Sequence, residues 1–113
     1  MDDLITRRIG ELLTAITESE QYKRYREVEE ILRAHPDYLE RVDTFRANNF
    51  RLQNDTSHED LFERAEKLAL ESKELRKIPE VNAYLDAELA MCKTLQKICK
   101  TLVDGVDIHV PEF

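Results

Sequence analysis

Apolar residues recur every three or four positions along almost the whole chain, which is the spacing of one face of an α-helix. Polar and proline-containing stretches interrupt this pattern and divide it into segments. The segments predict helices at about residues 2–17, 20–34, 36–54, 58–77 and 79–104, followed by a short extended tail over 105–113. The pattern therefore indicates an all-α bundle of about five helices.

Prolines, acidic residues and one glycine set several of these boundaries. Asp2 and Asp3 precede the first apolar residues, where they cap a helix and complement its dipole. Pro36 and Pro79 suit the first turn of a helix and disfavour helical geometry in the residue before them. Gly105 is placed to end the last helix as a left-handed cap.

Two capping boxes mark the remaining starts. In this motif a Ser or Thr side chain and an acidic side chain three residues later each bond to the other residue's backbone N–H. Thr17 with Glu20, and Ser57 with Asp60, fit the pattern. They predict the beginnings of the second and fourth helices.

The last predicted helix is apolar over more than a single stripe, whereas a helix on the outside of a small bundle needs only one. We therefore expect it to lie centrally or to pack on a second chain. After it, apolar and polar residues alternate over 106–110, which indicates an extended tail. The tail either lies over its own bundle or frays, or it reaches to a partner as an arm.

Composition agrees with one helical domain spanning residues 1–113. The 113 residues include only two Gly and three Pro, while 36% are charged, so an all-β fold is excluded. The net charge of -7 repels nucleic-acid phosphates and argues against direct nucleic-acid binding. No segment is apolar enough to span a membrane, and the Met-Asp-Asp start does not resemble a signal peptide. We expect a cytoplasmic protein without membrane contact.

Glu88 falls in the middle of the apolar face of the last helix, between Leu85 and Cys92. A buried carboxylate needs a partner, because an unpaired buried charge costs several kcal/mol. The third helix offers polar side chains on or beside its own apolar face, and we predict a buried network of Arg46, Asn49, Gln53 and Glu88. The network is expected to fix helix register or dimer geometry, and a ligand-binding or catalytic role for it is the alternative.

Cys92 and Cys99 lie two turns apart on one face, about 10.5 Å along the helix, and cannot form a disulfide with each other. Free cysteine behaves as a small hydrophobe, so we expect both to pack in a core. The alternative is that they ligate a metal shared between two chains. No CxxC or HxxxH spacing accompanies them.

No motif for catalysis or for a cofactor is present. His35, His58 and His109 are not part of a nucleophile motif, and two glycines can hardly build a phosphate-binding loop. Surface or capping roles are expected for the histidines. We predict no catalytic residue, no metal and no cofactor, and hence no enzyme.

Three segments carry a family resemblance. Residues 18–25 (ESEQYKRY), residues 42–53 (VDTFRANNFRLQ) and residues 84–89 (YLDAEL) look like the YlbF/YmcA family of small helical bacterial regulators, which includes the YheA-like proteins. The similarity extends to about Gly105.

The resemblance implies a non-enzymatic all-α bundle that forms homodimers or higher oligomers. Members of the family regulate competence, sporulation and biofilm formation, and some form a complex that assists an RNA-degrading enzyme. Related regulators or such an enzyme are therefore the implied partners. Members of that complex can carry iron–sulfur clusters held by cysteines, some of them in a Cys-rich tail, but residues 106–113 contain no cysteine.

Together these observations predict a non-catalytic regulatory or scaffold protein that self-associates, with a dimer favoured, and contacts protein partners. Aromatic and Arg residues dominate many interfaces. The apolar candidates for the interface or core are Phe45, Phe50, Leu52, Leu85, Met91, Leu95 and Leu102. The alternative function is an iron–sulfur or metal protein that uses Cys92 and Cys99 of two chains.

Overall fold

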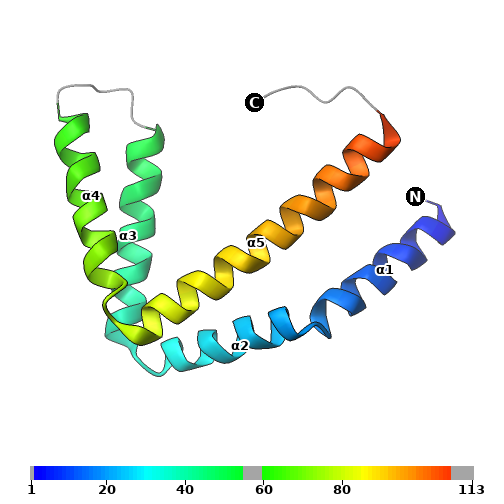
Figure 1. Ribbon diagram of the computed structural model, residues 1–113, viewed down its shortest axis with the longest axis horizontal. Helices are drawn as coiled ribbons and strands as arrows, with labels where there is room; N and C mark the ends of the chain where they lie inside the picture. The colour runs from blue at the N-terminus through cyan, green and yellow to red at the C-terminus, as the bar shows by residue number, and fades with distance from the viewer. Residues whose placement is uncertain (1, 55–59, 108–113) are drawn as a thin grey trace. The chain divides into compact units, whose positions relative to one another are not determined.

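The computed structural model describes residues 2–54 and 60–107 and contains five α-helices and no strand in these ranges. The helices are α1 (Asp3–Thr17), α2 (Glu20–Arg33), α3 (Pro36–Asn54), α4 (Leu61–Leu75) and α5 (Pro79–Val106) (Figure 1). The predicted all-α class is confirmed, with its five helices in order. Within these ranges, no helix combines the length and the apolar character that crossing a membrane requires.

The first helix begins as predicted, but the second is capped by a different residue. Asp2 caps α1, because its carboxylate accepts a hydrogen bond of 2.7 Å from the Leu4 N–H. The predicted Thr17–Glu20 capping box is wrong: Thr17 still belongs to α1, and its hydroxyl donates to the carbonyl of Leu13. Ser19 caps α2 instead, since its Oγ accepts from the Tyr22 N–H at 3.2 Å. Because α1 extends through Thr17, the cap lies two residues later.

The fourth helix begins at Leu61, three residues after the predicted start. Asp60 occupies the N-cap position without a side-chain bond to the helix backbone, and its carboxylate lies 3.8 Å from the Arg64 guanidinium. Residues 55–59, and with them Ser57 of the predicted capping box, lie outside the described residues. The helix ends at Leu75, two residues before the predicted end, and the N–H of Arg76 closes it on the Ser72 carbonyl at 3.0 Å.

The last helix continues past the predicted stop. Gly105 is helical, so the prediction of a left-handed cap there is wrong, and residues 105–106 are not part of an extended tail. The left-handed residue is Asp107, with φ of 55°, and its N–H donates to the Val103 carbonyl at 3.2 Å. This is the αL capping motif shifted by two residues, and Asp adopts the left-handed region more readily than most residues. The rest of the predicted tail, 108–113, lies outside the described residues.

The chain divides into two compact units, and α2 and α5 each contribute to both. Unit 1 consists of Met1–Tyr25 with Asp86–Phe113, and unit 2 of Arg26–Leu85. In unit 2, α3 and α4 pack side by side in opposite directions (Figure 1). Unit 2 holds most of the buried apolar side chains among the described residues: Val28, Leu32, Val42, Leu75, Val81 and Tyr84. A hydrophobic core of its own therefore stabilises unit 2.

Unit 1 contains α1, the start of α2 and most of α5, and Figure 1 shows α1 and α5 running in opposite directions. Thr94 of α5 donates a 2.5 Å hydrogen bond to the side-chain oxygen of Gln21 in α2. Among the described residues of unit 1, Met91 is the one buried apolar side chain. Unit 1 thus has long helices and almost no core.

Candidate functional site

The apolar face of α1 is exposed from Leu4 to Leu13, and Ile16 near its end is half-buried. No residue of α1 is buried, although its apolar residues have the spacing of one helix face. The large apolar side chains of this face retain between 40% and 60% of their accessible surface: Leu4, Ile5, Ile9, Leu12 and Leu13. An amphipathic helix in a soluble protein normally buries such a face, so this one lacks a covering partner within the described residues of the chain.

The second half of α5 carries another exposed apolar stripe. Cys92, Leu95, Cys99, Leu102 and Val106 are all exposed, and they follow one another at alternating intervals of three and four residues. This is the a/d spacing of a coiled coil, in which the seam of one helix packs against another helix. Leu89 and Val103 add exposed apolar surface beside the stripe. The faces of α1 and α5 together are called the unit 1 apolar surface below.

The residues of the predicted polar network are only partly buried. Arg46 and Asn49 on α3 are half-buried, Gln53 is exposed, and Glu88 on α5 is half-buried. The guanidinium carbon of Arg46 lies 5.3 Å from the centroid of the Tyr84 ring, which is the geometry of a cation–π contact. Glu88 belongs to unit 1 and the other three residues to unit 2, and a network that joins them stays a prediction.

The predicted apolar residues separate into two groups. Met91 is buried and Phe45, Leu52 and Leu85 are half-buried, which fits packing within the chain. The other three, Phe50, Leu95 and Leu102, are exposed. Leu95 and Leu102 belong to the unit 1 apolar surface, whereas Phe50 lies on α3 in unit 2.

Both cysteines are exposed, so the prediction that they pack in the core of one chain is wrong. The heptad-like stripe explains the error, because it places Cys92 and Cys99 on a side of α5 that the other described residues do not cover. Within the described residues, no three His, Cys, Asp or Glu side chains lie close enough together to hold a metal ion. A metal on either thiol would therefore need ligands from outside these residues.

Of the histidines, only His35 lies within the described residues. It is half-buried at the α2–α3 junction, and its ring stacks on that of Tyr38 with centroids 4.9 Å apart. The surface or capping role expected for His35 stays a prediction. His58 and His109 lie outside the described residues.

The polar faces of the helices carry ion pairs within single helices and turns. A hydrogen bond from Lys77, 2.8 Å long, lowers the pKa of the Glu74 carboxyl, and a 2.8 Å hydrogen bond to Asp104 raises the pKa of the Lys100 ammonium. These pairs are exposed, and exposed pairs contribute little to stability. They give the molecule a solvated outer face.

Comparison with known proteins places the chain in a family. A family model described as "Control of competence regulator ComK, YlbF/YmcA" matches residues 5–107, which is nearly the whole chain. The chain belongs to the YlbF/YmcA family. No curated protein and no solved structure gives a significant match. The predicted family and its regulatory character are thereby confirmed.

Sequence reasoning missed one part of the site in this YlbF/YmcA family member, namely the exposed face of α1. The apolar spacing of α1 was visible, but it indicates an amphipathic helix without saying what covers it. The α5 stripe was predicted in part, because the excess of apolar residues on that helix indicated that it lies centrally or packs on a second chain. The 3-4-3-4 spacing from Cys92 to Val106 was the signal for a helical partner.

Proposed function

We propose that the chain is a non-catalytic regulatory protein that acts as a homodimer assembled through the unit 1 apolar surface. The observation that carries this proposal is the contrast between the two units. Unit 2 buries six large apolar side chains among its described residues, whereas unit 1 buries Met91 alone. Isolated helices of the length of α1 are marginal in water and depend on packing of their apolar face.

The size of the surface is sufficient for a stable dimer. Ten large apolar side chains of α1 and α5 are on average about half exposed. Fully burying such a side chain contributes about 1.5–3 kcal/mol, so covering the exposed halves contributes about 10 kcal/mol per chain and about 20 kcal/mol for two. Association costs about 4–15 kcal/mol. The surplus includes the range of about 8–12 kcal/mol that corresponds to micromolar to nanomolar affinity.

A second copy of the chain is the occupant that the surface favours. Most soluble oligomers are symmetric homo-oligomers, and a two-fold interface uses the same surface on both subunits. The α5 stripe has the spacing that helices use to pair, and α1 supplies a second apolar face on the same unit. Two copies of unit 1 then bury their four faces as one helical core.

The assembled form is proposed to act on a protein partner in the cytoplasm. This part rests on membership in a family described by control of the competence regulator ComK. Sporulation, biofilm formation and the assistance of an RNA-degrading enzyme are further roles within the same proposal. The exposed ion pairs on the helix faces supply a charged outer surface for such a partner.

A charge placed in the α5 stripe tests the assembly. Leu95→Glu puts a carboxylate into the proposed interface, where its desolvation opposes pairing. We expect size-exclusion chromatography with light scattering to give a dimer for the wild-type chain and a monomer for Leu95→Glu, with equal helix content by circular dichroism. Leu70→Glu is the control, because Leu70 is an exposed apolar residue of α4 outside this surface. Equal masses for both variants would refute the proposed interface.

The same two variants test the regulatory role in a host cell. Leu95→Glu at the chromosomal locus is expected to reproduce the competence phenotype of deleting the gene, whereas Leu70→Glu retains the wild-type phenotype. Normal competence in the Leu95→Glu strain, with a protein shown to be monomeric, would separate regulation from assembly and contradict the proposal.

A further inference from the structure

A pocket of about 430 Å³ lies between α3 and α4, entirely within unit 2. Its lining comes from both helices: Asn48, Arg51, Arg64, Lys67, Leu68 and Glu71. Volumes of about 300–1,000 Å³ are typical of sites for small molecules. The pocket is thus large enough for a small organic ligand.

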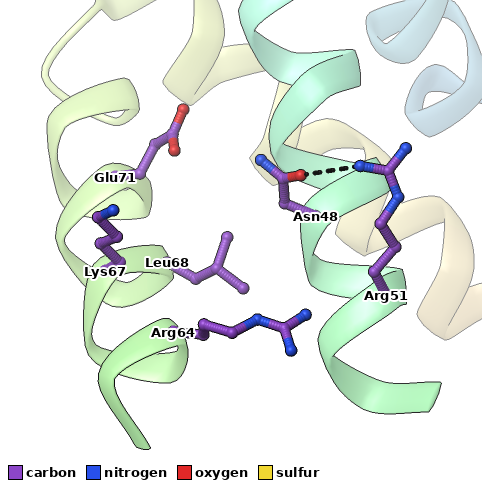
Figure 2. A pocket seen from close by; sticks show the side chains of 6 residues that line it. All are labelled: Asn48, Arg51, Arg64, Lys67, Leu68 and Glu71. Carbon is purple, nitrogen blue, oxygen red and sulfur yellow. Dashed lines mark hydrogen bonds between the residues drawn. The ribbon is translucent and has the colours of Figure 1, made fainter. Parts of the chain in front are cut away.

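The spacing of the lining residues explains why they meet. Arg64, Lys67 and Glu71 lie three and four residues apart and therefore share one face of α4, while Asn48 and Arg51 are three residues apart on α3. Figure 2 shows Arg64 reaching from α4 toward α3, with Arg51 on the facing helix. Cationic side chains from two helices therefore line the same space.

The charge of the pocket is opposite to that of the chain. Three cationic side chains, Arg51, Arg64 and Lys67, line it together with one carboxylate, that of Glu71, in a chain of net charge -7. Glu71 is seven residues from Arg64, about 10.5 Å away along the helix. The Arg64 end of the pocket is therefore separated from this carboxylate, whereas Lys67, four residues from Glu71 on the same face, lies beside it.

Both guanidinium groups already have contacts within the chain. Arg51 donates to the side-chain oxygen of Asn48 at 3.4 Å, drawn as a dashed line in Figure 2. Arg64 lies 3.8 Å from Asp60, and about a third of its side chain is exposed. A partly desolvated guanidinium interacts more strongly with an anion than a fully solvated one does. Leu68 adds apolar surface to the lining of the pocket, beside the polar side chains.

We propose that this pocket binds the phosphoryl group of a small organic phosphate monoester. The lining has two positive charges in excess, and a phosphate monoester carries about -1.5 to -2 charges at pH 7, whereas a single carboxylate carries only one. Guanidinium groups match the oxygens of a phosphoryl group through paired hydrogen bonds. Leu68 contacts the organic part of the ligand.

A neighbouring groove on α4 has the opposite balance of charge. It is about 350 Å³ in volume and shares Arg64 and Lys67, but it is also lined by Asp60, Glu63 and Glu66. Three carboxylates against two cations repel an anion. The proposal therefore places the phosphoryl group on the α3 side of Arg64 and Lys67.

Titration of the full-length chain with adenosine 5′-monophosphate, inorganic phosphate and adenosine, followed by the backbone amide signals in NMR, tests the site. We expect adenosine 5′-monophosphate and phosphate to shift amides near residues 48–51 and 64–71 in a saturable way, and adenosine to leave them unchanged. Binding is also expected to weaken as salt is added. Equal binding of adenosine, or shifts confined to other residues, would overturn the proposal.

Charge variants give the sharper result. Lys67→Gln is expected to weaken the binding of adenosine 5′-monophosphate roughly tenfold, and Glu71→Gln to tighten it about threefold, because removing the carboxylate removes repulsion. Lys73→Gln, an exposed residue of α4 outside the pocket, is the matched control and leaves affinity within about twofold. Unchanged affinity in Glu71→Gln contradicts the site. If a short single-stranded RNA binds much more tightly and shifts the same amide signals, the pocket is an RNA-binding site and not a site for a small phosphate monoester.

Discussion

Truncation of Leu13 gives a quantitative test of the α1 face. Leu13 retains 60% of its accessible surface in the single chain, and the proposed dimer covers it. Full burial of a leucine contributes about 1.5–3 kcal/mol, so loss of the covered 60% in Leu13→Ala removes about 0.9–1.8 kcal/mol per copy. Both copies in a symmetric dimer lose this contribution, which raises the dissociation constant roughly 20- to 400-fold.

Leu70→Ala is the control for this experiment because Leu70 is also 60% exposed but lies on α4, outside the unit 1 apolar surface. Sedimentation velocity over a dilution series measures the dissociation constants of both variants and the wild-type chain. We expect Leu70→Ala to match the wild type. If Leu13→Ala and Leu70→Ala dimerise equally well, α1 is not part of the interface and the reasoning from its exposed face is wrong.

Three further results are expected from the core, the ion pairs and the thiols. Leu75→Ala removes a fully buried side chain of unit 2 and should lower the free energy of unfolding by about 2–5 kcal/mol in urea titrations, against less than about 0.5 kcal/mol for Leu70→Ala. Lys77→Ala should raise the pKa of Glu74 in a carboxyl NMR titration. The Lys77–Glu74 pair stabilises the folded chain slightly at pH values above the ordinary pKa of Glu. This stabilisation is lost as the pH falls through the lowered pKa of Glu74. Both thiols should react slowly with a maleimide in the assembled chain and faster on dilution to monomer, and equal rates would contradict burial of the α5 stripe.

The sequence predicted helix boundaries well where a backbone restriction determines them. Pro36 and Pro79 each begin a helix as expected, because proline fixes φ and lacks the N–H that a first-turn residue does not need. The helix end predicted at Gly105 is wrong. Glycine is tolerated inside a helix at a cost of about 1 kcal/mol, and α5 continues through Gly105 to Val106. A glycine permits a helix end without requiring one.

The exposed surface was less predictable because an apolar stripe does not specify its partner. The stripe of α1 has the same spacing whether it covers the core of its own chain or that of a second chain. Cys92 and Cys99 were expected in a core because of their residue type, yet their exposure depends on which side of α5 the other described residues cover. That choice depends on contacts between residues far apart in the sequence.

Sedimentation equilibrium of the full-length chain from nanomolar to high micromolar concentration tests the central claim most directly. The single chain has a mass of 13.3 kDa. The proposed assembly through α1 and α5 predicts a concentration-dependent rise to twice that mass. A mass of 13.3 kDa at every concentration would contradict it, because the unit 1 apolar surface would then stay in water.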